Sequence, residues 1–401
     1  MSNLGSRPKS SFWKLLLFML ITTRFFGLNF LTNYFPEQKY LILPLGLLAL
    51  VIAINNRYYS LYGKWLLLLA FCLVCNCLSA HFIRGASFSL AFGGASSTAG
   101  LLMFFLIQAI HPTVQDVEKV LKYMGIMALC VYFLQLICLP VPIVESISSG
   151  WRVESAIKMD INKFSISAEV CAVLLMLWCI NRILERFSIK YMIISLMVIV
   201  MYIFHGYRSL LFGLVVSVIS VFILFNRGKL KIKYFFFFSI IAVVVYLVLQ
   251  MPFLQDMLSF MIDRSADQVS GRIEEVDRVI ELNYFFNDYL LGPWEWIFGS
   301  GFIGKVEGSW VNWVDLGFIG YSFVGGLMMT FCWLKLLVIC IRDTPKEYAY
   351  LSAFSIYLIA STLTLPTAFN EQAPVIQALC FYLAYMVKTR NKQTEQKLVT
   401  I

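Results

Sequence analysis

A polar break in an otherwise apolar chain is the feature that most limits how this sequence can fold. Apolar segments of membrane-spanning length fill most of the 401 residues, but residues 250–315 are rich in charge, glycine and proline. Hydrocarbon tolerates neither irregular backbone nor unpaired charge. We therefore expect residues 250–315 to form one large loop outside the bilayer and to carry the activity of the protein.

The composition predicts an all-α, polytopic integral membrane protein with a single domain, residues 1–401. Hydrophobic residues make up 60% of the chain and charged residues 14%, whereas soluble domains are about 45–50% apolar and about 25% charged. A span needs roughly 20 apolar residues. The sequence indicates about twelve spans, near residues 14–33, 39–54, 61–79, 88–110, 119–140, 164–181, 190–205, 208–225, 234–250, 314–338, 348–365 and 373–387.

The basic residues are divided unequally between the two predicted sides of the membrane. With a cytoplasmic N-terminus, 21 Lys and Arg residues fall on the cytoplasmic side and 10 on the other side. The positive-inside rule describes such a bias. We interpret the net charge of +9 as a consequence of topology and not of nucleic-acid binding. Both termini are expected in the cytoplasm, with residues 250–315 and a smaller loop, residues 141–163, on the outer face.

The ten cysteines lie in or beside the predicted spans. Cys72, Cys75 and Cys77 are spaced like part of a metal-ligand set, but a structural zinc site usually needs four ligands and no second cluster completes this one. Cysteine is also a common small buried residue. We therefore expect no metal and no cofactor.

Two arginines at the predicted outer surface are the strongest candidates for chemistry. Arg208 stands between two apolar runs, where an arginine is costly unless it is paired or faces water; the alternative is an anchor that reaches the interface. Arg272 follows Ser270-Gly271 in the large loop. Arginine binds phosphate through a planar fork, so the pair suits a lipid diphosphate. The alternative for Arg272 is a surface pair with Glu275.

Carboxylates near the end of the large loop are candidates for a general base. Glu307 and Asp315 adjoin an apolar boundary, where a raised pKa would favour proton transfer. For Asp315 an interfacial cap is the favoured interpretation. His205 lies next to the arginine segment and is a further proton acceptor. Trp310 and Trp313 are interpreted either as an aromatic belt at the interface or as stacking platforms for sugar rings.

Several motifs, in a fixed order, resemble those of the O-antigen polymerase and O-antigen ligase superfamily. The layout is also similar, with about twelve spans and one large outward loop before the last three. The matching segments lie within about residues 204–321 and are Gly206-Tyr207-Arg208-Ser209-Leu210-Leu211, Ser270-Gly271-Arg272, then Asn287, Pro293 and Gly299-Ser300-Gly301, and finally Leu316-Gly317-Phe318-Ile319-Gly320. Tyr207 stands where serine is usual in the family.

The resemblance implies a metal-independent, inverting glycosyltransferase in the bacterial inner membrane. Such enzymes move a glycan from one polyprenyl diphosphate carrier onto the sugar of another, on the outer face, to build O-antigen, capsule or exopolysaccharide. The implied partners are the carrier-linked glycan, membrane lipid, a chain-length regulator and a flippase. The implied site residues are Arg272, Arg208, Glu307 and His205 for catalysis, and Arg152, Arg278, Trp310 and Trp313 for substrate binding.

Three other functions remain open at the level of sequence. A ligase would use the same carrier with a lipid A-core acceptor, but ligase members often carry His-Asn where this chain has Val306 and Glu307. A transporter or flippase would place ionisable residues deep in several spans, and here Arg24 and Glu169 are the main candidates. A membrane scaffold would leave the outward arginines unexplained.

Overall fold

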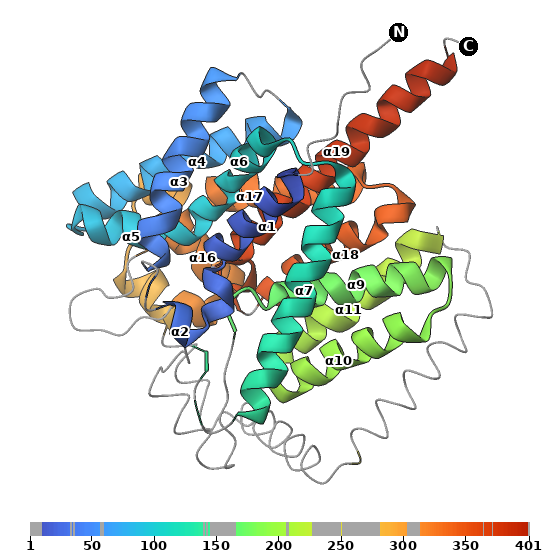
Figure 1. Cartoon of the computed structure of the whole chain (residues 1–401). Helices are drawn as coiled ribbons and strands as arrows, with labels where there is room; N and C mark the ends of the chain where they lie inside the picture. Colours follow the sequence, from blue (N-terminus) through green and yellow to red (C-terminus); the bar gives the residue numbers. More distant parts are fainter. Residues whose placement is uncertain are drawn as a thin grey trace.

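The part of the chain with a described structure is entirely helical. A computed structural model describes residues 10–32, 34, 37–56, 60–138, 141, 143–144, 166–205, 208–226, 250, 281–302, 313–363, 365–370 and 372–399. Within these ranges the regular elements are helices (Figure 1), and extended backbone pairs at one isolated antiparallel bridge between Leu28 and Val144. The all-α fold expected from the composition is confirmed for these residues.

Fifteen α-helices follow one another in the described part of the chain. They are α1 (Ser10–Thr22), α2 (Asn29–Thr32), α3 (Gln38–Asn55), α4 (Leu61–Phe82), α5 (Phe88–Ala99), α6 (Met103–Ile110), α7 (Val114–Ile137), α9 (Val170–Glu185), α10 (Ile189–His205), α11 (Arg208–Asn226), α15 (Pro293–Phe298), α16 (Gly317–Gly325), α17 (Leu327–Asp343), α18 (Ala349–Thr362) and α19 (Ala373–Val399).

Several of these helices have the length and composition of membrane spans. Among the described residues, four helical stretches are long and apolar enough to cross a bilayer: Leu61–Phe82, Phe88–Ile110, Val114–Ile137 and Ser209–Asn226. Three shorter apolar helices are Ser11–Thr22, Lys39–Asn55 and Ile189–Ile203. These helices indicate a membrane protein. The predicted span at residues 234–250 lies outside the described part of the chain except for residue 250.

Some apolar runs that the sequence predicts as single spans are broken helices. The run 88–110 consists of α5, a 3-10 turn at Gly100–Leu102, and α6. The run 314–338 consists of a 3-10 turn at Trp313–Leu316, then α16 and α17, and it breaks at Gly326, whose φ of 85° lies in the left-handed region. Only glycine adopts such a backbone without strain, so the sequence itself provides for this break.

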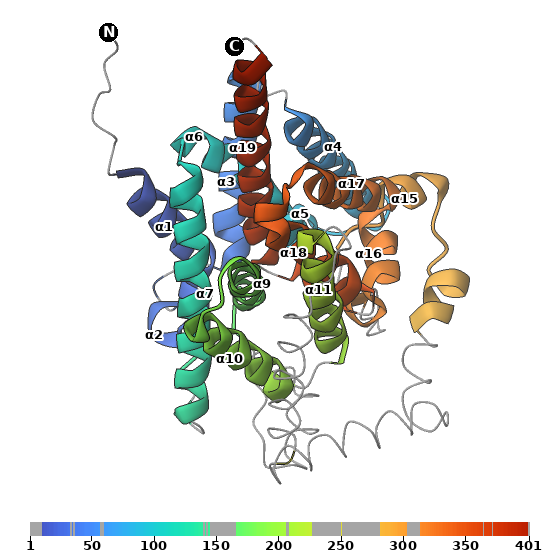
Figure 2. The same ribbon diagram turned by 90° about the vertical axis from the view of Figure 1, so that its right-hand side faces the viewer.

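Side-chain caps and small residues explain how the helices begin and pack. Thr113 and Asp116 form a capping box at the start of α7, with both reciprocal hydrogen bonds at 3.2 Å; this arrangement satisfies two donors that a helix start would otherwise leave free. Helix α7 then approaches α9 closely at Gly125, where an added Cβ would lie 2.5 Å from Leu175 Cβ. Figures 1 and 2 show α7, α9, α10, α11 and α18 gathered on one side of the bundle.

Two groups of polar contacts between the helices lie at opposite ends of the bundle, and others, such as the bond that Trp333 Nε1 donates to Gln377 Oε1, are buried within it. The first group, here named the termini end, includes the start of α1 and the second half of α19, which lie toward the same side in both views (Figures 1 and 2). Its contacts are Ser11–Asp116 at 2.9 Å, Tyr350–Glu118 at 3.2 Å, Asn181 to the Glu347 carbonyl at 2.9 Å, and Lys388–Asp343 at 2.5 Å.

The second group, here named the loop end, includes the C-terminal ends of α4 and α7. Helix α4 runs antiparallel to α17, with Tyr62 beside Cys340 and Cys72 beside Cys332, so its last turn is far from Asp343. There Arg84 meets Glu295. In the last turn of α7, Gln135 Oε1 accepts hydrogen bonds from the N–H groups of Ile143 and Val144, and Asn29 N–H donates to the Ile143 carbonyl at 2.7 Å.

This arrangement predicts that the two ends face opposite sides of the membrane. A cysteine placed at Val141, which is 63% exposed at the loop end, should react with a membrane-impermeant maleimide in intact cells. A cysteine placed at exposed Lys346, at the termini end, should react only after the cells are permeabilised. The unmodified chain measures the background from its own cysteines, most of which are buried. Labelling of both positions in intact cells would contradict the predicted sidedness.

Candidate functional site

The most extensive polar network at the loop end surrounds a short helix from the segment that the sequence singles out. Residues 281–302 pass through a π-helical turn at Tyr284–Asp288, then α15, and then the turn Gly299-Ser300-Gly301. Pro293 occupies the first turn of α15, where its missing N–H has no cost. Glu295 reaches back to accept a hydrogen bond from Gly292 N–H at 2.9 Å. These local signals explain why so short a helix forms.

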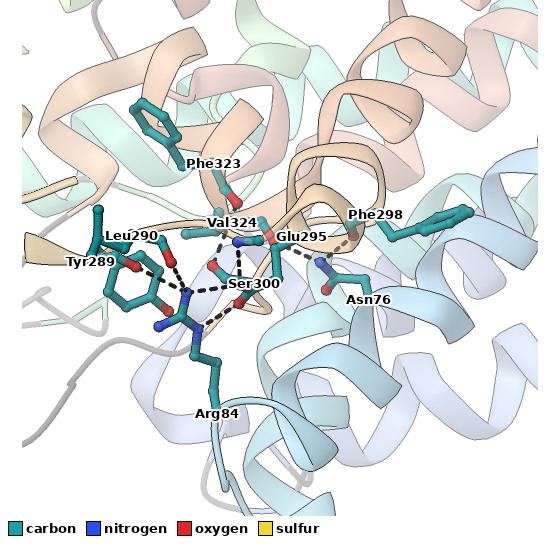
Figure 3. A network of polar contacts seen from close by, with 10 residues as sticks. Asn76, Arg84, Tyr289, Leu290, Glu295, Phe298, Ser300, Phe323 and Val324 are labelled. Carbon is teal, nitrogen blue, oxygen red and sulfur yellow. Dashed lines mark hydrogen bonds and ion pairs between the residues drawn. The ribbon is translucent and has the colours of Figure 1, made fainter. Parts of the chain in front are cut away.

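The turn Gly299-Ser300-Gly301 caps the broken end of α16. Ser300 N–H donates to the Phe323 carbonyl at 3.2 Å, and Gly301 N–H donates to the Val324 carbonyl at 3.0 Å. These carbonyls have lost their usual helical partners because α16 ends at Gly325. The turn thus supplies, from another part of the chain, the donors that the missing next turn of helix would have provided (Figure 3).

Asn76, in the middle of α4, completes this cap from the opposite side. Its Nδ2 donates to the Val324 carbonyl at 2.6 Å and to the Phe298 carbonyl at 2.8 Å, so one side chain joins the ends of α15 and α16 (Figure 3). Asn76 is fully buried, and its Oδ1 has no hydrogen-bond partner within the described residues.

Glycine is required in this turn because the neighbouring backbones approach too closely for a side chain. Gly301 has φ +98°, and an added Cβ would lie 2.3 Å from Ala80 Cβ of α4. Gly299 has φ +85°, and its added Cβ would lie 2.3 Å from the Val324 carbonyl oxygen. Both the sign of φ and the space available exclude other residues.

Arg84 binds the other end of α15. Its Nε lies 2.5 Å from Glu295 Oε1, its Nη2 lies 3.0 Å from Oε2, and Nη2 also donates to the Tyr289 carbonyl at 2.9 Å. The guanidinium centre lies 3.9 Å from the centroid of the Tyr289 ring. The exposed fractions of the two charged side chains are 20% for Arg84 and 3% for Glu295. We name Arg84, Glu295, Tyr289 and Asn76 the loop clamp.

The chemistry of the loop clamp favours anchoring over ligand binding. The charges of Arg84 and Glu295 neutralise each other through a two-point contact, which is strong and directional. Burial raises the pKa of the Tyr289 phenol, so the ring stays neutral against the guanidinium. The clamp therefore holds residues 289–301 against α4 and α16 without leaving a net charge for a substrate.

Most of the residues that the sequence predicts for the site lie outside the described part of the chain. These are Arg272, Glu307, Arg152, Arg278 and Trp310. His205 ends α10 and Arg208 begins α11, but their side chains, like that of Asp315, are outside the described residues. Their roles stay predictions.

Trp313 is the one predicted site residue whose side chain is described. Its ring centroid lies 5.7 Å from Phe302 and 6.4 Å from Tyr321, and the side chain is partly buried. The Trp313 carbonyl lies against Gly320, where an added Cβ would come within 2.0 Å of it. Trp313 therefore helps to join the 3-10 turn to α16, and its predicted role in sugar stacking is untested.

Contacts between aromatic rings connect this region to the end of α18. Tyr321 stacks on Phe369 with ring centroids 3.4 Å apart, and its hydroxyl lies 3.2 Å from Thr98 Oγ1. Phe369 follows the C-terminal end of α18, and Gly213, near the start of α11, packs against Ser361 in the last turn of α18. These contacts join α16 to the segment that follows α18, and the last turn of α18 to the start of α11.

Sequence reasoning did not single out the residues of the loop clamp. The sequence does contain a signal for Asn76, because an amide inside the apolar run 61–82 must find hydrogen-bond partners. Arg84 stands between two predicted spans, outside every motif that the sequence offers. In the described part of the chain no three His, Cys, Asp or Glu side chains gather as a metal site. Cys72, Cys75 and Cys77 are all buried, as expected of small core residues.

Comparison with known proteins identifies no relative of this chain. No family model, no curated protein and no solved structure matches this chain.

The loop clamp predicts that Arg84→Gln strongly destabilises the protein. Removal of one partner from a buried ion pair costs about 3–5 kcal/mol, and the partial exposure of Arg84 places the expected loss near the lower limit. The apparent melting temperature of the purified protein in detergent measures this loss. Because the pair acts as a unit, Arg84→Gln with Glu295→Gln should lose less than the sum of the single changes.

Arg342→Gln is the matched control for this measurement. Arg342 also contacts a carboxylate, Asp343, but its side chain is 64% exposed. Asp343 keeps its contact with Lys388 at 2.5 Å when Arg342 is removed, and an exposed cation contributes little, about 0–1 kcal/mol, so the melting temperature should barely change. Equal shifts for Arg84→Gln and Arg342→Gln would contradict the clamp.

Proposed function

We propose that the protein polymerises glycan repeat units carried on polyprenyl diphosphate, at the outer face of the inner membrane of a bacterium. The observation that supports this most is the placement of residues 281–302 by the loop clamp. These residues connect the segment that contains Arg272 to the segment that contains Glu307. The clamp fixes the described residues between these two segments to α4 and α16.

The position of α11 gives further support. Arg208 begins α11. The first turns of α11 pack on the last turn of α18 at Gly213, and Phe369, which follows α18, stacks on Tyr321 of α16. The sequence motifs that contain Arg208 and Arg272 are far apart in the chain. A shared anion site requires that these two motifs come together in the fold.

The proposed reaction is a displacement at the anomeric carbon of the donor sugar. A hydroxyl of the acceptor sugar attacks that carbon, the bond to the diphosphate oxygen breaks, and the configuration inverts. Arg208 and Arg272 bind the diphosphate and stabilise the negative charge that develops on it as it leaves. Glu307 or His205 accepts the proton of the acceptor hydroxyl. A new glycosidic bond and a free carrier diphosphate are the products.

A transporter is less well supported by the described residues. Transporters place ionisable groups near the middle of several spans. In the four candidate spans of the described chain, the charged side chains lie toward the helix ends, as Lys64 and Lys122 do. A ligase shares the carrier and the chemistry, so the products must separate it from a polymerase.

A deletion strain complemented with variants tests the proposal through a gel of surface polysaccharide. Arg272→Ala should abolish the polymer ladder at an unchanged protein level, because loss of a preorganised positive contact to the leaving group typically costs about 10²–10³ in kcat. Arg208→Lys should also be poor, since a point charge does not replace the planar fork. Arg264→Ala, a change in the same outward loop, is the control and should keep the ladder.

The pattern of products distinguishes the functions. Single repeat units on the acceptor indicate loss of a polymerase. Loss of all attached repeats, with long polymer on the carrier lipid, would identify a ligase instead. An unchanged ladder in the deletion strain would refute both activities for that polysaccharide, and a normal ladder in Arg272→Ala would refute the role of that residue.

A further inference from the structure

A hollow at the termini end lies apart from the proposed catalytic end. It is a cavity of about 330 Å³ between the end of α11, the end of α17 and the start of α18. Its apolar wall comes from Ile223, Leu224 and Ile341, and its polar rim from Thr344, Lys346 and Ser352. The cavity therefore has one apolar side and one polar side, and the polar side carries a single cationic residue, Lys346.

The charged groups near this cavity leave Lys346 available. Lys346 is exposed and makes no ion pair within the described residues. By contrast, Asp343 is 3% exposed and is neutralised by Lys388 at 2.5 Å and Arg342 at 3.1 Å. Glu347 is exposed next to Lys346 but does not line the cavity. The lining thus presents a positive charge to an occupant.

The hydroxyl groups of the rim do not require a ligand of their own. Thr344 Oγ1 donates to the Cys340 carbonyl at 2.6 Å, and Ser352 Oγ donates to the Ile341 carbonyl at 3.2 Å. Each hydroxyl oxygen can still accept a hydrogen bond. The selectivity of the cavity therefore depends on the charge of Lys346.

An exposed apolar stripe leads along α11 into the cavity. Phe212, Val215, Ile219 and Ile223 recur at three- and four-residue spacing, and their exposed fractions are 56%, 56%, 48% and 58%. Residues at this spacing share one helix face. The opposite face of α11 packs on α18 through Gly213 and Leu214. The stripe ends at Ile223, which is itself part of the cavity wall.

We propose that this cavity binds an acidic phospholipid, with its phosphate head group at Lys346 and an acyl chain along the apolar stripe of α11. Exposed apolar residues along α11 lead to the cavity, and Lys346 lies beyond the end of the helix. An amphiphile with an anionic head group fits this sequence of apolar and charged surfaces. Basic pockets between helices near the membrane surface are suited to such head groups. The binding is independent of the proposed polymerase activity.

Native mass spectrometry of the full-length protein, titrated with phosphatidylglycerol or phosphatidylcholine, tests the proposal. The wild-type protein should bind phosphatidylglycerol more tightly. Lys346→Gln should weaken that binding about fivefold, as expected for one lysine near an acidic head group, and should leave phosphatidylcholine binding unchanged. Lys64→Gln removes an exposed lysine from the start of α4, outside the cavity, and should change neither.

A second variant tests the cavity itself. Leu224→Trp fills the hollow and should reduce the binding of both lipids, while the elution volume of the purified protein checks its fold. Equal affinity of the wild-type protein for the two lipids would overturn the proposal. An unchanged affinity for phosphatidylglycerol in Lys346→Gln would also overturn it, because the site would then lie elsewhere.

Discussion

The rest of this structure depends on one constraint: backbone groups at a break in a buried helix must still form hydrogen bonds. In an apolar bundle, a helix that stops before the surface leaves carbonyl groups that water cannot reach. Helix α16 stops at Gly325, and donors from Gly299-Ser300-Gly301 and from Asn76 satisfy its last carbonyls. Three separate parts of the chain are thereby fixed to one another through backbone groups.

The charged pair of the loop clamp follows from this backbone arrangement. Once the glycine turn is seated on α16, α15 lies beside the end of α4, and Glu295 is almost fully buried. A buried carboxylate is unfavourable without a cation, and Arg84 supplies it through two contacts to the same carboxylate. The position of the pair is therefore set by the cap, and the pair in turn prevents α15 from leaving the bundle.

The sequence predicts the class of this fold better than its internal connections. Apolar composition and the polar break at residues 250–315 predict a helical membrane protein, and the described helices agree with that class. The partners of Arg84 and Asn76 could not be predicted, since they lie 205–248 residues away in the chain. Gly299 and Gly301 belong to a motif in the sequence. The reason that these positions require glycine is the close approach of Ala80 and Val324, which only the structure shows.

The engagement of Arg84 limits which residues can serve the proposed chemistry. A guanidinium that stabilises a leaving diphosphate must meet that charge in the transition state. Two nitrogen atoms of Arg84 already contact Glu295, and the Tyr289 ring covers one face of the group. Release of Arg84 toward a substrate would leave the buried Glu295 without its cation. Arg84 is therefore unsuited to carry the diphosphate, and the proposed reaction needs other arginines for that task, for which we propose Arg208 and Arg272.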